Sequence, residues 1–269
     1  MKFDTVNAAL KGQEWGITEE QGRLLYDYVL RAKAARILEL GTGIGTSACY
    51  MAAALDELGG GTVTTIDRNP DLPAHVRRTF EKADSALQQH VRVVTSSSSY
   101  NDELLSLIEA QTRDGRCEPC FDLCYIDGAH TWEADGCAFF LADKLLVPGG
   151  MMLFDDMGWT IAGSPEASKH AWTQAMSPEL RATAQVTKVF DLLVMPHPDY
   201  GDFAKTGDWG WARKKGGVGE GMSARSLFTP PTLRAEVKEV VRKVARHILW
   251  KITGRTSKAS RAREDRQSG

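Results

Sequence analysis

The stretch from Arg36 to Gly45, which reads Arg-Ile-Leu-Glu-Leu-Gly-Thr-Gly-Ile-Gly, constrains the fold more than any other part of the chain. Its apolar first half predicts a short buried strand, and its glycines predict a tight turn that leads into a helix. Glycine allows a ligand to approach the backbone closely. The spacing Gly-x-Gly-x-Gly differs from the Gly-x-Gly-x-x-Gly of dinucleotide sites, and it therefore disfavours a nicotinamide-dependent oxidoreductase. A turn with a purely structural role remains the alternative.

Strands and helices alternate along the chain after this turn. We expect strands near residues 37–40, 62–66, 91–95, 121–126 and 151–154, separated by helices near 46–57, 72–88, 102–110 and 133–145. A helix near 165–176, a strand near 186–195, a loop over 196–208 and an edge strand over 209–214 complete the pattern. This alternation predicts an α/β protein with a Rossmann-like, open and mostly parallel seven-stranded sheet that carries helices on both faces.

Shorter segments flank the sheet domain, which we place at residues 36–215. Residues 1–35 form an expected N-terminal helical cap, with a helix over 18–32 that Thr18 can cap. Residues 216–231 are rich in Gly, Ser and Pro and predict a linker. An apolar stripe with basic outer faces predicts an amphipathic helix over 232–253, and the polar composition of residues 254–269 predicts a disordered basic tail.

Charge is distributed unevenly along the 269 residues. The net charge of −2 gives no bias towards nucleic acid, but residues 232–269 contain 11 Lys and Arg against 4 Asp and Glu. The basic helix favours packing or a homo-oligomer, with peripheral contact to an anionic membrane as the alternative. No apolar stretch is long enough to span a membrane, and the N-terminus lacks a signal pattern, so we expect a cytoplasmic protein.

Five cysteines, an odd number, occur without disulfide-like spacing and agree with a reducing compartment. Cys117 and Cys120 form a Cys-x-x-Cys pair, which on its own is compatible with zinc. Cys124 falls in a predicted strand and Cys137 in a predicted helix, so the four thiols are not expected to converge on one ion.

In a parallel open sheet, ligands bind beyond the carboxyl ends of the strands. Glu39 lies at the end of the first strand, and Asp67 ends the second strand, where a carboxylate can hold the two hydroxyls of a ribose. Asp67 is also compatible with a simple turn. The third strand ends in four serines, among which Ser97 and Ser98 can reach a base edge, although a serine run is more often only a loop.

Three further carboxylates follow the fourth and fifth strands: Asp127, Asp155 and Asp156. Carboxylates gathered at one rim repel one another, and a divalent cation relieves that repulsion. Oxygen ligands favour Mg²⁺, Mn²⁺ or Ca²⁺ over zinc, whereas helix caps or turns are the structural alternative. His130 follows Asp127 by three residues, where an imidazole can take a proton from a hydroxyl.

These residues together resemble the class I S-adenosylmethionine-dependent methyltransferases, and more narrowly the metal-dependent O-methyltransferases of the catechol, caffeoyl-CoA and macrocin types. The similarity covers about residues 12–215 and is strongest over 37–45 and within 125–156. The resemblance implies that residues 36–215 are the methyltransferase domain. It implies that S-adenosylmethionine is bound by Glu39, Gly41, Thr42, Gly43, Gly45, Asp67, Ser97, Ser98 and Asp127. It also implies that Asp127, Asp155 and Asp156 bind a divalent metal, Mg²⁺ by preference.

The chain departs from the family pattern at two points that bear on its chemistry. His130 stands where the catechol and caffeoyl-CoA enzymes carry a catalytic lysine, and Asp155-Asp156 replaces their usual Asp-Asn. Both features are closer to the macrocin-type enzymes, which methylate sugar hydroxyls. The resemblance therefore implies an O-methyltransferase in which His130 is the catalytic base and a small hydroxylated molecule is the acceptor.

Two other functions keep the same cofactor. One is a methyl or aminopropyl transferase that acts on nitrogen without a metal, and the other is a non-catalytic S-adenosylmethionine-binding interaction protein. The joint presence of Asp127, His130, Asp155 and Asp156 disfavours both. Trp159, Trp172 and Tyr200 are candidates for the lining of the acceptor pocket, although such aromatic residues often belong to a core.

Overall fold

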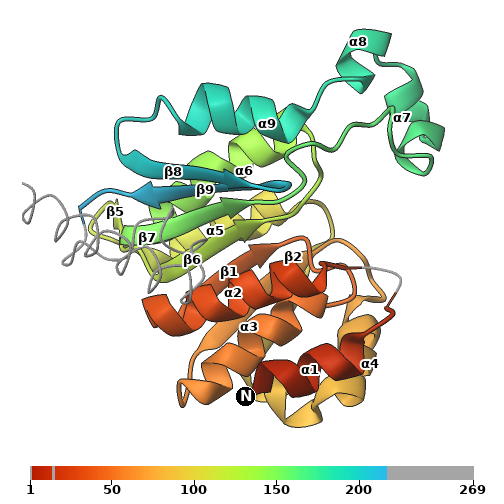
Figure 1. The fold of residues 1–269 in the computed structure, drawn as a ribbon. Coiled ribbons are helices and arrows are strands. Elements are labelled where there is room, and N and C mark those ends of the chain that lie inside the picture. The colour runs from red at the N-terminus through yellow and green to blue at the C-terminus, as the bar shows by residue number, and fades with distance from the viewer. Residues whose placement is uncertain (1, 14–15, 217–269) are drawn as a thin grey trace, which may run out of the picture. The chain divides into compact units, whose positions relative to one another are not determined.

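A seven-stranded sheet lies at the centre of the protein, whose computed structural model describes residues 2–13 and 16–216 (Figure 1). Its first five strands run parallel in the order β3 (Val91–Thr95), β2 (Thr62–Asp67), β1 (Arg36–Leu40), β6 (Phe121–Ile126) and β7 (Leu146–Phe154). Two antiparallel strands, β9 (Trp209–Lys214) and β8 (Tyr200–Thr206), continue the sheet beyond β7. The predicted Rossmann-like, mostly parallel seven-stranded sheet is confirmed.

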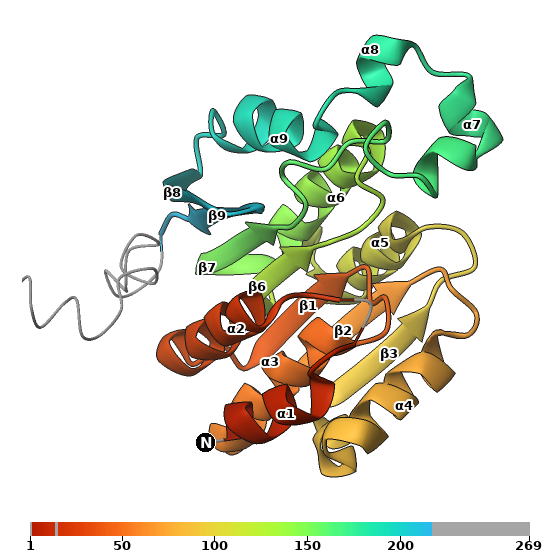
Figure 2. The ribbon, with the colours of Figure 1, turned by 45° about the vertical axis from the view of Figure 1, so that its right-hand side comes forward.

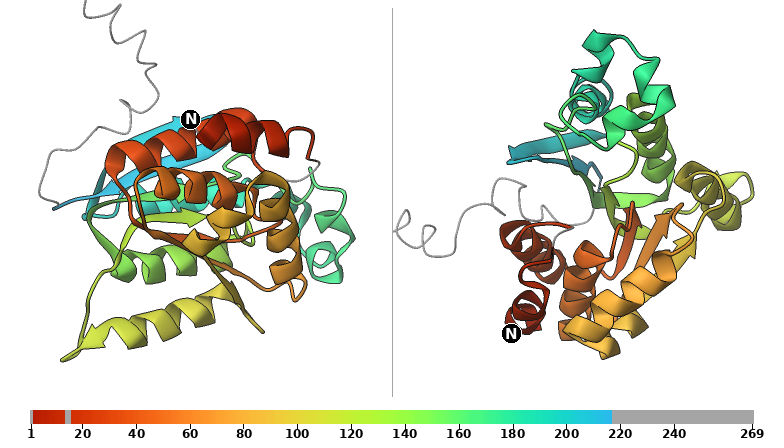
Figure 3. Two further views of the ribbon diagram at one scale, coloured as in Figure 1. Left: turned by 90° about the horizontal axis from the view of Figure 1, so that it is seen from below. Right: turned by 90° about the vertical axis from the view of Figure 1, so that its right-hand side faces the viewer.

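Helices cover both faces of this sheet (Figures 2 and 3). One layer consists of α1 (Lys2–Leu10), α2 (Glu19–Ala32), α3 (Thr46–Glu57) and α4 (Leu72–Ala83), which contact one another. The other consists of α5 (Tyr100–Gln111), α6 (Trp132–Leu145) and α9 (Gln185–Val189). Because both faces are covered, the central strands are almost continuously apolar and buried, as parallel strands require. A short helix, η1 (Ser85–His90), and a small hairpin of β4 (Thr112–Arg113) and β5 (Arg116–Cys117) fill two connections.

The N-terminal part begins with two helices, of which the sequence predicted one. Thr18 caps α2 as expected: its side chain accepts a hydrogen bond from the Gln21 amide at 3.2 Å, and the Gln21 side chain accepts one from the Thr18 amide at 2.8 Å. The helix α1 was not predicted. It is held by Phe3, which is buried and stacks on Tyr50 of α3 at a ring distance of 5.3 Å.

The strand predicted over residues 186–195 is wrong, because this segment is helical. It forms α9, which continues into the π-helical turn η3 (Phe190–Val194). Its four buried apolar residues, Val186, Val189, Phe190 and Val194, recur at helical spacing, whereas 66% of Leu192 is exposed. Valine-rich composition favoured a strand, but the side of the segment that packs against α6 follows the helical period.

The C-terminal edge of the sheet also differs from the prediction. The expected loop over 196–208 contains β8, and the strand at 209–214 lies between β7 and β8, so β8 is the edge strand. The expected helix over 165–176 is broken into the short helices η2 (Ala167–Lys169) and α7 (Ala171–Gln174), followed by α8 (Pro178–Arg181). Figures 1 and 2 show α7 and α8 projecting beyond the sheet.

Three predicted segments lie outside the described residues: the linker after Gly216, the amphipathic helix over 232–253 and the tail over 254–269. Within residues 2–13 and 16–216, no helix has both the length and the apolar character needed to cross a bilayer.

Candidate functional site

A cavity of about 1230 Å³ opens at the carboxyl edge of the parallel strands. It lies where β1 is flanked by β2 on one side and β6 on the other, the point at which the strand order reverses. Ligands of open α/β sheets bind at such points. Its walls come from the glycine turn after β1, the end of β2, the start of α5, the loop after β6 and the segment after β7.

The glycine turn can be built only from glycine at its first position. Gly41 has a φ of 90°, and a Cβ atom there would lie 1.7 Å from the carbonyl oxygen of Asp127. Gly43 has a φ of 53°, and a Cβ atom there would meet nothing within 4 Å. The turn therefore packs against the loop after β6 at one end and presents bare backbone to the cavity at the other.

Asp67 holds the glycine turn from the end of β2. Its Oδ2 accepts hydrogen bonds from the Thr42 amide at 2.9 Å and the Gly43 amide at 3.2 Å, and its Oδ1 accepts one from the Asn69 amide at 3.0 Å. A carboxylate has about four acceptor positions, so Asp67 retains acceptor capacity. It lines the cavity, and its predicted contact with ribose hydroxyls stays a prediction.

Glu39 lies beneath the turn and is fully buried. The hydroxyls of Ser47 and Thr65 each donate a hydrogen bond of 2.5 Å to one of its carboxylate oxygens. Burial raises the pKa of Glu39 to about 7, although these two hydrogen bonds act in the opposite direction. The structure thus shows Glu39 joined to β2 and α3 by these bonds, and its predicted contact with the cofactor stays a prediction.

Two hydroxyls of the serine run after β3 form hydrogen bonds with groups nearby in the chain. The hydroxyl of Ser96 donates to the carbonyl of Ser99 at 2.9 Å, and the hydroxyl of Ser98 donates to Asp102. Ser97 is exposed, whereas Ser99 caps α5 and lines the cavity. The predicted role of Ser97 and Ser98 beside an adenine stays a prediction, and Ser99 is the residue of the run that the structure brings to the cavity wall.

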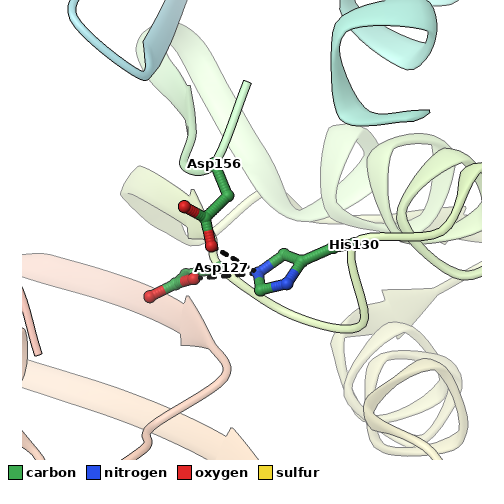
Figure 4. A group of neighbouring side chains, drawn as sticks. All are labelled: Asp127, His130 and Asp156. Atoms are coloured by element: carbon green, nitrogen blue, oxygen red, sulfur yellow. Dashed lines mark hydrogen bonds and ion pairs between the residues drawn. The ribbon is translucent and has the colours of Figure 1, made fainter. Parts of the chain in front are cut away.

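Asp127, His130 and Asp156 converge on one point of the cavity (Figure 4). The Nε2 atom of His130 lies 3.2 Å from Oδ1 of Asp127 and 3.2 Å from Oδ2 of Asp156. Asp127 and His130 belong to the loop between β6 and α6, whereas Asp156 follows β7. The sequence predicted that the carboxyl ends of these two strands would bring these residues together, and the structure shows that they do.

Both loops carry backbone strain at this point. His130 has a φ of 56° and Asp156 a φ of 53°, in the left-handed region that residues other than glycine seldom adopt. Such conformations cost about 1–3 kcal/mol and persist only where the surroundings enforce them. The two side chains are therefore aimed at each other by unusual backbone geometry.

The electrostatics of this group depend on its partial burial. Burial lowers the pKa of His130, but the hydrogen bond and charge of Asp127, together with the charge of Asp156, outweigh burial and raise that pKa. Burial raises the pKa of both Asp127 and Asp156, while His130 opposes the rise in each case. The ionised form of each carboxylate is therefore stabilised by a positive neighbour, and His130 provides part of this stabilisation.

Asp155, the third predicted metal ligand, points elsewhere. It is 5% exposed, accepts a hydrogen bond from the Tyr125 hydroxyl and accepts another from the Asp156 amide at 2.7 Å. Burial raises its pKa. The structure thus shows Asp155 supporting the loop that carries Asp156, and its role as a metal ligand stays a prediction.

The donor set fits a divalent cation. Ligand atoms of Asp127, His130 and Asp156 all lie within 4.8 Å of one another, and two of them are carboxylate oxygens, which hard cations prefer. Among the described residues, no other group of three or more histidine, cysteine and acidic side chains has this arrangement. The cysteines weighed as a zinc site lie in different environments, since Cys124 is buried and Cys137 is exposed.

Aromatic residues form the wall beyond this acidic group. Trp159 lies against His130 with a ring distance of 5.0 Å, and Trp172, which is 51% exposed, lines the same cavity together with Met176. These two tryptophans were expected there. Tyr200 was also a candidate, but it is buried in the core and donates a hydrogen bond to Asp143. The sequence missed Tyr100, which lines the cavity and follows the serine run directly.

Comparison with known proteins agrees with this arrangement. Residues 38–157, which contain the glycine turn and the acidic group, match the family model of a methyltransferase domain. No curated protein sequence matches the chain. The match covers less than half of the chain, and together with the observed sheet it indicates a methyltransferase domain.

Solved structures of O-methyltransferases share the fold. The O-methyltransferase from Bacillus cereus, in complex with S-adenosylhomocysteine, has a TM-score of 0.56 at 24% identity, covering 80% of this chain and 90% of that one. The O-methyltransferase TomG from Streptomyces achromogenes, in complex with S-adenosylmethionine, has a TM-score of 0.54 at 21% identity and the same coverage. The Podospora anserina methyltransferase PaMTH1 has a TM-score of 0.55 at 19% identity, covering 80% of this chain and 86% of that one. The resemblance stated from the sequence is confirmed for the fold and for the methyltransferase class.

Proposed function

We propose that this protein is an S-adenosylmethionine-dependent O-methyltransferase that uses a divalent cation, Mg²⁺ by preference, to methylate a hydroxyl of a small molecule. The observation that carries the proposal is the convergence of Asp127, His130 and Asp156 beside the glycine turn. The cofactor assignment is supported by that turn and by structural neighbours solved with the methyl donor or its product. An enzyme acting on nitrogen without a metal, or a binding protein, needs no such group.

Each residue of the site then has a stated task. A bound cation would hold two acceptor oxygens and lower the pKa of the hydroxyl that reacts. Asp127 and Asp156 would bind that cation, and His130 would take the hydroxyl proton at Nε2. Because the same two carboxylates raise the pKa of His130, neutralising them returns the imidazole towards the form that accepts a proton. Trp159 lies against one side of the His130 ring.

The character of the acceptor end favours a neutral polyhydroxylated or phenolic molecule, such as a sugar, a glycosylated natural product or a catechol. Tryptophan faces suit the apolar surfaces of sugar or aromatic rings, and carboxylates suit hydroxyl groups. Among the described residues that line the cavity, Arg68 is the sole lysine or arginine, and it follows Asp67 at the cofactor end. An acceptor with a phosphate-rich handle, such as a coenzyme A thioester, would lack a cationic partner at the acceptor end.

The test is methyl transfer from labelled S-adenosylmethionine to a panel of sugars, glycosides and catechols, followed by mass spectrometry. We expect a product that carries one additional O-methyl group, loss of activity after EDTA treatment, and recovery with Mg²⁺. Full activity of the metal-stripped protein would remove the metal from the mechanism. Binding of the cofactor without turnover on any acceptor would favour a non-catalytic role.

A further inference from the structure

A buried aspartate that the proposed mechanism does not use, Asp135, contacts the loop over 127–131. Asp135 of α6 is 1% exposed, and the hydroxyl of Tyr100 donates a hydrogen bond of 2.6 Å to its Oδ1. The amide of Ala129 faces both partners, at 3.2 Å from the Tyr100 hydroxyl and 3.3 Å from Oδ1 of Asp135. Three elements, namely α5, α6 and the loop over 127–131, therefore meet in one hydrogen-bonded group.

Tyr100 and Asp135 both contact the loop over 127–131. The ring of Tyr100 packs so closely on Gly128 that a Cβ atom there would lie 2.7 Å from it. Burial raises the pKa of Asp135, and its hydrogen bonds from Tyr100 and from the backbone of the loop oppose that rise. Taking a carboxylate out of water costs several kcal/mol unless its oxygens are hydrogen-bonded. Here the compensating bonds come from the Tyr100 hydroxyl and from the Ala129 amide of the loop.

The loop needs such support because His130 adopts a left-handed backbone conformation with a φ of 56°. For residues other than glycine this conformation is unfavourable, and a loop left to itself would relax from it. Relaxation would rotate the imidazole away from Asp127 and Asp156. The amide that donates to Asp135 is that of Ala129, the residue directly before His130.

We propose that Tyr100 and Asp135 are positioning residues that hold the loop over 127–131 in the strained form in which His130 faces Asp127 and Asp156. The effect on catalysis rests on the proposed function, whereas the effect on the loop does not. A purely structural role in joining α5 to α6 is the competing explanation. It predicts that removing the Tyr100 hydroxyl affects the loop no more than removing another tyrosine hydroxyl that donates to an aspartate of α6.

The protein contains a matched control at the opposite end of α6. Tyr200 is buried and its hydroxyl donates a hydrogen bond of 2.9 Å to Oδ1 of Asp143, so Tyr200→Phe removes the same kind of bond far along the helix from the loop. Tyr100→Phe and Tyr200→Phe are each compared with the unaltered full chain. Asp135→Asn, which keeps the shape of the side chain and weakens the acceptor, is the second variant at the loop.

Three measurements separate the explanations. In Tyr100→Phe we expect amide hydrogen exchange over 127–131 to accelerate at least tenfold, Mn²⁺ affinity measured by electron paramagnetic resonance to fall at least tenfold, and kcat to fall with little change in the KM for the methyl donor. Asp135→Asn should show a smaller change in the same direction, and Tyr200→Phe none. Equal exchange over 127–131 in the two tyrosine variants would overturn the proposal. If the unaltered protein binds no Mn²⁺ and transfers no methyl group, the proposed function fails, while the exchange comparison still decides the role of Tyr100 and Asp135.

Discussion

The burial of Glu39 makes the stability of the cofactor-free protein depend on pH in a predictable direction. Its carboxyl group is 0% exposed, and burial raises its pKa from 4.5 to about 7. The folded state therefore binds this proton more tightly than the unfolded state. The resulting contribution to stability is fully present below about pH 4.5 and is lost as the pH rises through about 7.

The size of the effect follows from the pKa change. Each pKa unit corresponds to 1.36 kcal/mol, so the contribution that is lost between about pH 4.5 and pH 8 is about 3 kcal/mol. Glu39→Gln removes the titrating group and keeps its length. The amide can still be paired, because the hydroxyls of Ser47 and Thr65 can rotate to accept as well as donate. Any mismatch in that pairing shifts stability equally at every pH and leaves the slope unaffected.

Urea unfolding, followed by circular dichroism at several pH values between 5 and 8, gives the required free energies. We expect the difference in unfolding free energy, Glu39→Gln minus the unaltered protein, to increase by about 2–3 kcal/mol across this range. Glu109→Gln, on the exposed side of α5, is the control and should show a constant difference. Groups such as Asp127 and His130 titrate in all three proteins and cancel. A constant difference for Glu39→Gln as well would refute the reasoning.

Three further outcomes are expected. Gly41→Ala should lower the free energy of unfolding in urea by about 3 kcal/mol or more, because its Cβ atom would overlap the carbonyl of Asp127. Gly43→Ala should lower it by about 1 kcal/mol, and equal losses in the two variants would contradict this prediction. Trp172→Ala should raise the acceptor KM and leave stability within about 0.5 kcal/mol, since the side chain is half exposed on the cavity wall; an unchanged KM would remove it from the acceptor site. His130→Ala should lower kcat by about 10²–10⁴ while calorimetry shows an unchanged cofactor affinity, and an unchanged rate would exclude it as the base.

The sheet was predictable because its signals are local. The parallel strands are short runs rich in apolar and β-branched residues, each followed or ended by glycine, serine or aspartate, so these local signals locate them without knowledge of the rest of the chain. The local sequence of the segment over 186–195 indicates its secondary structure less clearly. Its valines suit a strand, and only its packing against α6 selects a helix. The strand β8 was missed for a related reason, since its pairing with β9 compensates for a weak local sequence pattern.

The convergence of residues at the candidate site was predictable from the sequence, whereas the direction of each side chain was less so. The rule that ligands bind beyond the carboxyl ends of parallel strands brings Asp127 and Asp156 to one place from sequence alone. The direction of each side chain depends on tertiary packing. Asp155 turns towards Tyr125, whose position follows from the register of β6 and β7, and Tyr100 reaches the loop only because α5 and α6 lie side by side.

Asp127 links the two halves of the site in a way that sequence spacing could not show. Its carbonyl oxygen fills the space that a side chain on Gly41 would need, and its amide donates to the carbonyl of Leu40 at 2.8 Å. Its carboxylate, at the same time, faces His130. A methyl group is transferred only when donor and acceptor are held in line at short distance. Because one residue contacts the glycine turn through its backbone and the proposed base through its side chain, a shift of either loop would alter that alignment.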